Sequence, residues 1–132
     1  LAKHGLTFGG HTGIRVCHTE ATRESGSIAT RELLAEKKRP TAIICLADIQ
    51  ALGVYEECAR AGLSIPGDVS VVGFDDIPFA AFMNPPLTTL CQPGFKKGEA
   101  AAEALVSLIA KREARSVTMD ASLVARGSLK SL

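Results

Sequence analysis

The chain has no strong excess of either charge and no long apolar run. Its 132 residues carry 15 Lys and Arg against 14 Asp and Glu, a formal net charge of +1. This balance leaves too little positive charge for a protein that binds nucleic acid on its own, because such proteins neutralise several phosphates at once. No apolar run approaches the ~20 residues that a transmembrane helix needs, so we expect no membrane partner.

The chain also lacks a C-x-x-C pair among its four cysteines, at positions 17, 45, 58 and 91. Cys17, Cys45 and Cys91 fall inside apolar, strand-like runs. This placement favours buried free thiols over disulfides or metal ligands. Free thiols are typical of a reducing compartment, so we expect a cytoplasmic protein.

A catalytic or metal site finds little support. Cys17 and His18 are adjacent, but on a strand they point to opposite faces and cannot form a nucleophile–base pair. The three histidines, His4, His11 and His18, have no carboxylate or thiolate at ligand spacing. The glycine-rich loop 9–13 connects a helix to a strand, the reverse of a phosphate-binding loop. We therefore predict no enzyme, no metal and no cofactor.

What is present is the composition of an ordinary globular domain, with 46% apolar and 22% charged residues.

The chain opens on Leu1 rather than Met, and residues 1–5 read like a helix that ends at Gly5. We therefore expect a piece of a longer protein, and the lack of a signal peptide says nothing about the parent.

Hydrophobic periodicity predicts strands and helices in alternation, which is typical of a parallel sheet in an α/β fold. Thr22 is a plausible N-cap for the first helix, and Asp48 for the second. The strand 41–46 is uninterrupted and apolar, which suits burial on both faces. The expected strands are 14–18, 41–46, 69–74, 88–92, 117–119 and 123–126, and the expected helices are 23–38, 49–61 and 95–112.

Two of these strands are followed by carboxylates. Asp48 comes after the strand 41–46, and Asp75 and Asp76 come after the strand 69–74. Ligands of open parallel sheets bind beyond the carboxyl ends of the strands, where carboxylates accept hydrogen bonds from sugar hydroxyls. The alternatives are structural: Asp48 as a helix cap, and Asp75 and Asp76 as caps of the following turn. Spacing alone leaves the two interpretations balanced.

Four motifs occur in one order: ADIQALG at 47–53, AGLSIPGDVSVVGFDD at 61–76, PPLTTLCQP at 85–93 and LVARGS at 123–128. Together they strongly resemble the effector-binding region of the lactose-repressor (LacI/GalR) family of bacterial transcription regulators. The resemblance spans roughly residues 19 to 128. It implies a Rossmann-like lobe of a periplasmic-binding-protein-like type I fold, in which a small ligand lies between two α/β lobes.

The resemblance also implies roles for individual residues. Asp48 and Asp75 look like ligand-contacting carboxylates, and Gln92 looks like a cleft residue beside the hinge. Ala21 stands where well-studied members stack an aromatic ring on their ligand, and Ala47 where some sugar-responsive members carry a polar residue. Because of these two departures the resemblance does not identify the effector, which is expected to be a sugar or a related metabolite.

The domain division follows from the same resemblance. Residues 1–92 would form the C-terminal lobe, 93–116 the crossover helix of the N-terminal lobe, and 117–132 the return strands. Most of the N-terminal lobe and the whole DNA-binding domain would be missing, so operator DNA would be bound only through a domain absent here. We expect the apolar face of the helix 95–112 to pack on another copy of the chain or on its own sheet.

A homodimer is the expected assembly. Leu52 lies about 100° away from the core stripe of its helix, as helix geometry requires. With Phe82 and Met83 it is expected to form an exposed apolar patch, and family members pair through the corresponding surface. Ordinary core filling is the alternative, and Leu52→Asp in the intact parent distinguishes the two.

The favoured function is therefore the ligand-sensing and dimerisation domain of a transcription regulator. The runner-up is a periplasmic sugar-binding protein of a transporter, which shares the fold. The cysteines favour the first, because unpaired thiols are typical of the cytoplasm. An enzyme on a related fold would need a nucleophile or base beside Asp48 or Asp75, and the sequence offers none.

Overall fold

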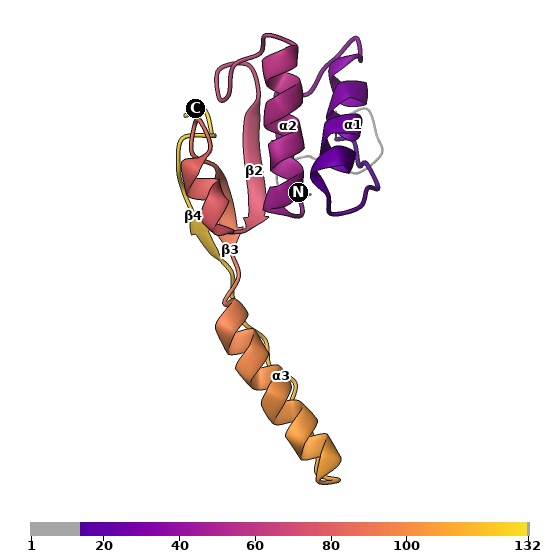
Figure 1. Ribbon diagram of the computed structural model, residues 1–132, viewed down its shortest axis with the longest axis vertical. Coiled ribbons are helices and arrows are strands. Elements are labelled where there is room, and N and C mark those ends of the chain that lie inside the picture. Colours follow the sequence, from indigo (N-terminus) through magenta and orange to yellow (C-terminus); the bar gives the residue numbers. More distant parts are fainter. Residues whose placement is uncertain (1–13, 132) are drawn as a thin grey trace.

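The computed structural model describes residues 14–131, which form a mixed α/β fold (Figure 1). The predicted strand–helix alternation is confirmed, because a strand precedes and follows the second helix. The predicted helix end at 1–5 and the loop 9–13 lie outside the described residues. In chain order the elements are α1 (Arg23–Leu34), β1 (Ala42–Ile44), α2 (Asp48–Arg60), β2 (Ser70–Asp75), the 3-10 helix η2 (Pro78–Phe82), β3 (Thr88–Cys91), α3 (Gly94–Ile109) and β4 (Ser122–Val124).

The four strands form one sheet in the order β1-β2-β3-β4. β1 and β3 run parallel to the central β2, and β4 pairs antiparallel with β3. Ser128 lies beside β2 where β3 begins: its backbone oxygen accepts from Val71 N, and its hydroxyl donates to Val71 O at 2.6 Å and accepts from Thr88 N at 2.8 Å. The mainly parallel sheet expected from the sequence is therefore present.

Helix α1 begins as predicted and ends four residues early. The Thr22 side chain accepts a hydrogen bond from Ser25 N, which satisfies one of the free donors of the first turn. The helix ends at Leu34 rather than at residue 38, and Ala35 is its C-cap. The partly buried Leu34 is the last residue of α1 that packs against the core. Most of the residues that follow are exposed, so packing no longer supports the helix.

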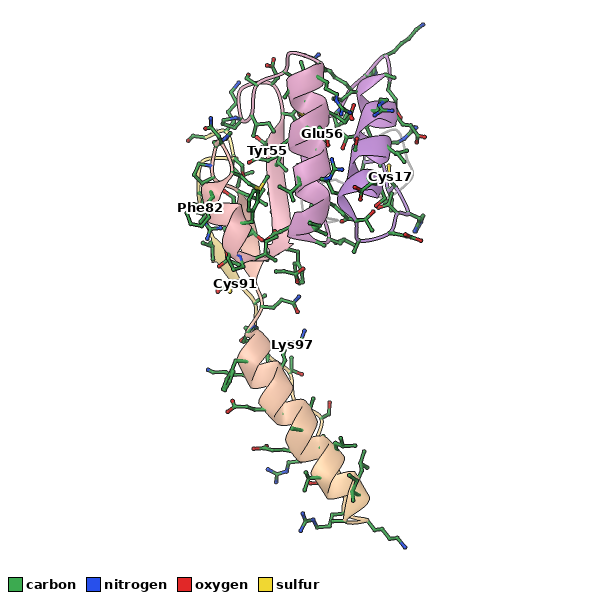
Figure 2. All side chains as sticks on the ribbon, in the orientation of Figure 1. Cys17, Tyr55, Glu56, Phe82, Cys91 and Lys97 are labelled. Carbon is green, nitrogen blue, oxygen red and sulfur yellow. The ribbon has the colours of Figure 1, made fainter. Side chains whose placement is uncertain are left out.

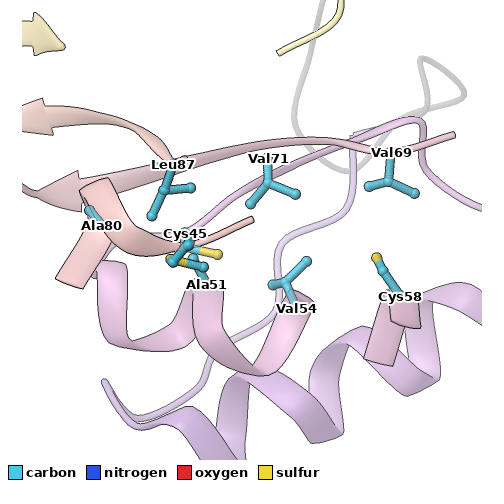
Figure 3. Packing of buried hydrophobic residues seen from close by; sticks show 9 residues of the cluster. Cys45, Ala51, Val54, Cys58, Val69, Val71, Ala80 and Leu87 are labelled. Atoms are coloured by element: carbon cyan, nitrogen blue, oxygen red, sulfur yellow. The ribbon is translucent and has the colours of Figure 1, made fainter. Parts of the chain in front are cut away.

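The core lies between α2 and one face of the sheet (Figure 3). Ala51, Val54 and Cys58 of α2 face Val69 and Val71, which precede and enter β2. Ala80 of η2 and Leu87 close the same face near Cys45. Burial raises the pKa of the Cys45 thiol to about 12, with a smaller contribution from the nearby Asp48, so Cys45 stays protonated at neutral pH.

The opposite face of the sheet is open over the described residues, so the prediction that the strand 41–46 is buried on both faces is wrong. Ile44 is 73% exposed and Leu46 is 82% exposed. On the neighbouring strands Phe74 pairs with Leu90, which pairs with the exposed Leu123. The sequence expectation fails because burial on both faces requires a second layer, and no helix of residues 14–131 supplies one.

Two expected strands are not formed. Residue 14 makes an isolated bridge, and 15–20 have no regular structure, so Cys17 is exposed rather than buried. Residues 117–119 also have no strand partner within the described chain. Both stretches have β-forming side chains, but a strand is stable only when a neighbour satisfies its backbone groups.

Helix α3 projects away from the sheet, and none of its residues is buried (Figure 1). Its apolar residues Leu105, Leu108 and Ile109 are exposed. The expectation that this face packs onto its own sheet is therefore wrong, because the chain leaves β3 in a direction that carries α3 off the lobe. Packing against another copy of the chain stays a prediction.

Helices α1 and α2 approach each other closely at two glycines. A Cβ atom added at Gly53 would lie 2.3 Å from Arg23 O and 2.3 Å from Ser27 N, both backbone atoms of the other helix. Beside this contact the Ser27 hydroxyl donates to Glu57 at 2.5 Å, and Arg31 Nη2 donates to the same carboxylate at 2.9 Å. These hydrogen bonds, that of Arg31 foremost, lower the pKa of Glu57 to about 2. The packing of α1 against α2 thus depends on small and polar residues.

Candidate functional site

The candidate site lies where the parallel strands end and α3 leaves the lobe (Figure 1). β2 ends at Asp75, β3 ends at Cys91, and these two residues are partners in the sheet. α2 begins at the same edge, with Asp48 as its first residue. Open parallel sheets bind their ligands beyond the carboxyl ends of their strands, which is where these residues lie.

Asp48 is fully buried at this edge, with an exposed fraction of 0%. Its two carboxylate oxygens accept from Ile77 N at 2.9 Å and from the Thr89 hydroxyl at 2.7 Å. The predicted helix cap is wrong, because Ala47 occupies the N-cap position and Asp48 bonds across the sheet instead. These contacts support a structural role over direct contact with a ligand.

Asp75 is exposed and is held in an uncommon backbone conformation. Its φ is +116°, and that of Asp76 is +56°. Residues with side chains rarely adopt these angles, and such conformations are found most often at functional sites. Gln92 Nε2 donates to Asp75 Oδ1 at 2.5 Å, which leaves the other carboxylate oxygen available as an acceptor.

Asp76 has a different partner from Asp75. Its Oδ1 accepts from Arg126 Nη2 at 2.7 Å, and Arg126 Nη1 donates to Leu87 O at 2.9 Å. Both side chains of the ion pair are largely buried. Asp76 therefore ties the turn after β2 to the end of the chain, which explains this acid without a ligand.

Gln92 connects the end of the sheet to α3. Its Oε1 accepts from Lys97 Nζ at 2.5 Å, while its amide nitrogen donates to Asp75. Lys97 lies at the first turns of α3, beside the junction with the lobe (Figure 2). Lys97, Gln92 and Asp75 thus form one hydrogen-bonded chain across the junction, which we call the junction relay. The sequence resemblance pointed to Gln92 and Asp75 but not to Lys97.

A groove of about 420 Å³ opens beside the junction relay. Phe74 of β2 and Gln92 line one end, and α3 contributes one wall with Lys97 and three alanines. The return segment contributes the other wall, which includes Arg115. The lining residues are Phe74, Gln92, Pro93, Lys97, Ala100, Ala101, Ala104, Arg115, Val117, Met119 and Ala121.

Ala21 is exposed in the segment that precedes α1. This segment is tied to the first turn of α2, because Gln50 Nε2 donates to Thr19 Oγ1 and to Glu20 O, each at 2.9 Å. Ala21 therefore follows a segment that is anchored at the same end of α2 as Asp48. The anchoring role of Gln50 had no signal in the sequence, because it depends on contacts 30 and 31 positions apart.

The three residues predicted for a dimer interface differ in burial. Phe82 is 81% exposed on η2, where it points outward from the lobe (Figure 2). Leu52 is partly buried against the core, and Met83 is only 7% exposed within it. An exposed patch of all three is therefore wrong for Met83, because this side chain belongs to the buried core cluster.

The described residues offer little for catalysis. Partial burial, with a smaller contribution from Asp76, raises the pKa of the Cys91 thiol, so it stays protonated and is a poor nucleophile. Within residues 14–131 no three His, Cys, Asp or Glu side chains gather closely enough to hold a metal ion. No helix in this part of the chain is long and apolar enough to span a membrane.

Comparison with known proteins agrees with this fold. Residues 6–129 match the family model described as periplasmic binding protein-like domain. The lactose operon repressor of Rhizobium radiobacter is 43% identical over 108 residues, which are 81% of this chain and 96% of that protein. The ribose operon repressor of Haemophilus influenzae is 38% identical over 111 residues, which are 83% of this chain and 33% of that protein. This chain thus spans about a third of the length of several curated relatives.

A solved structure shows the same architecture. A LacI family transcriptional regulator from Enterococcus faecalis V583, determined with bound ribose, aligns with a TM-score of 0.80 and 32% identity. The alignment covers 89% of this chain and 44% of that chain. The Rossmann-like lobe of a periplasmic-binding-protein-like fold, expected from the sequence motifs, is confirmed, and the chain corresponds to part of the domain in these neighbours.

Proposed function

Because the chain belongs to the lactose-repressor (LacI/GalR) family of transcriptional regulators, we propose that it senses a small effector and thereby controls the binding of operator DNA. The effector is a sugar or a related metabolite, held between this lobe and a second one. Among the described residues, 14–92 and 117–131 contribute the lobe, and 93–116 cross to the second lobe. DNA is bound by a separate N-terminal domain, and the regulator acts in the cytoplasm.

The observation that carries this proposal is the exposed Asp75 at the end of β2. Its carboxylate is presented by a strained backbone and oriented by Gln92, so one oxygen is left to accept a hydrogen bond from a hydroxyl. The relatives support the chemical class, since one is named a ribose operon repressor and one neighbour was solved with ribose. All of these relatives are transcriptional regulators, which disfavours the alternative of a transporter's sugar-binding protein.

We expect Asp75→Asn to reduce strongly the stabilisation of the full-length protein by its sugar effector. The substitution removes the charge that strengthens a hydroxyl hydrogen bond, which corresponds to a loss of about 10- to 100-fold in affinity. The measurement is a thermal-shift screen of neutral and charged sugars, followed by titration of each sugar that raises Tm.

Asp76→Asn is the matched control, because it changes the adjacent carboxylate, which is already paired with Arg126. It should lower Tm without ligand and still allow a ligand-induced rise. Equal ligand-induced shifts in the wild type and in Asp75→Asn would show that Asp75 does not contact the effector.

We also propose that the regulator is a homodimer whose interface includes Phe82 rather than Met83. Phe82→Asp in the full-length protein should shift sedimentation toward the monomer, because a buried charge disrupts an apolar interface. Leu52→Asp is a weaker probe, because Leu52 also packs against the core. A Phe82→Asp protein that stays dimeric would contradict the proposed interface.

A further inference from the structure

Arg126, which belongs to the last of the four sequence motifs, is fixed by two buried partners outside the candidate site. Its backbone N–H donates to Thr88 Oγ1 and its Nη1 donates to Leu87 O, each at 2.9 Å. Thr88 and Leu87 are both fully buried. Because neither contact involves the turn after β2, the position of the guanidinium is set independently of that turn.

The other end of the guanidinium reaches the residue that directly follows Asp75. Arg126 Nη2 donates to Asp76 Oδ1 at 2.7 Å, although the two residues are 50 positions apart. Their side chains are only 19% and 20% exposed, so solvent ions screen this pair less than a pair on an open surface. An arginine that donates from a rigid fork to two acceptors restrains each of them in direction as well as in distance.

The turn that Arg126 contacts has a backbone that needs support. Asp75 has a φ of +116° and Asp76 a φ of +56°, and residues with side chains keep such angles where surrounding contacts enforce them. Two contacts from other elements do so here: the ion pair at Asp76, and the hydrogen bond from Ile77 N to Asp48 Oδ2 at 2.9 Å. Ile77 lies one residue further from Asp75, so the ion pair acts on the closer residue.

We propose that Arg126 is a positioning residue for effector binding, because through Asp76 it holds the backbone turn that presents the Asp75 carboxylate. This inference rests on the proposed function and adds to it a residue that acts without touching the effector. Gln92 orients the carboxylate of Asp75 directly, whereas Arg126 fixes the backbone from which that side chain extends. Loss of Arg126 therefore weakens effector binding in a protein that still folds.

The test is calorimetric titration of the full-length protein with ribose and lactose, the sugars named for the relatives above, and with each further sugar that raises Tm. Arg126→Met should weaken binding by about 10-fold. Arg126→Lys should weaken it less, because lysine keeps a positive charge beside Asp76. Asp76→Asn should bind nearly as tightly as the wild type, because its amide oxygen can still accept from Arg126.

A double variant distinguishes positioning from a general loss of stability. When Asp75→Asn has already removed the charged carboxylate, its placement matters less, so adding Arg126→Met should cost little more. The combined loss of affinity should be smaller than the product of the two single losses by at least about 3-fold. Losses that multiply fully would mean that Arg126 acts independently of Asp75, which would overturn the inference.

Ser128→Ala is the matched control for stability. It removes two hydrogen bonds, to Val71 O and from Thr88 N, from the same C-terminal segment, but at the start of β3 rather than at the turn. It should lower Tm and leave the affinity for sugar unchanged. If Arg126→Met does not fold, Asp76→Ala removes the same ion pair from its other end and should weaken binding to the same degree.

The outcomes separate this inference from the proposed function. If Asp75→Asn loses sugar binding while Arg126→Met and Asp76→Ala keep it, only the positioning role is overturned. An equal loss of affinity in Ser128→Ala would trace the effect to stability and would also overturn that role. If no sugar binds the wild-type protein, the proposed function fails and the inference fails with it.

Discussion

Gly53→Ala is expected to lower the free energy of unfolding by about 3 kcal/mol, at the upper end of the cost of overpacking a tight contact. A Cβ at this position would lie 2.3 Å from Arg23 O and from Ser27 N, which belong to the backbone of α1. A Cβ at Gly26 would meet Gln50 O of α2 at the same distance. Because these obstacles are backbone atoms, only a shift of one whole helix can relieve the clash.

The chain provides a matched control for this substitution. Gly98 lies within α3, and a Cβ added there meets nothing within 4 Å. Gly98→Ala should therefore raise the free energy of unfolding by about 0.5–1 kcal/mol, because alanine has a higher helix propensity than glycine. Urea denaturation followed by circular dichroism measures both variants. If Gly53→Ala proved as stable as Gly98→Ala, the close approach of α1 and α2 would be refuted.

The second large effect is expected at Asp48. Asp48→Ala should lower the free energy of unfolding by about 3 kcal/mol, because it leaves the Ile77 N–H and the fully buried Thr89 hydroxyl without their acceptor. Asp48→Asn should cost less, since the amide oxygen can still accept from Ile77 N and the amide nitrogen can donate to Thr89. Denaturant unfolding of both variants, and of each combined with Thr89→Val, measures the interaction energy between residue 48 and Thr89.

The same variants separate a structural role of Asp48 from a ligand contact. Folded Asp48→Asn should keep its affinity for the effector, whereas Asp75→Asn should lose it. The opposite pattern, with wild-type stability of Asp48→Asn and no binding, would make Asp48 a ligand contact after all. The distinction matters because the family motif points equally to both carboxylates.

Some errors of the sequence-based prediction share one cause. Ile44 and Leu46 look like core residues of a buried strand, yet they are exposed because burial depends on what covers the other face of the sheet. Met83 looks like a candidate for an exposed patch, yet it is buried in the core, where the chain after η2 is tied to α2 by the Tyr55 hydroxyl, which donates to Pro85 O. In each case the side chain has the chemistry that was inferred, and its neighbours decide its exposure.

The sequence by itself determined the order of the helices and of the four strands of the sheet, the N-cap at Thr22 and the family, because periodicity, capping and motifs are local properties that are read within a few residues. It also placed Asp75 at the end of a strand. Only the tertiary structure decided that Asp48 bonds Thr89, 41 positions away, that Gly53 meets α1, and that Lys97 is joined through Gln92 to Asp75. These contacts join segments that the fold alone brings together, so no local pattern encodes them.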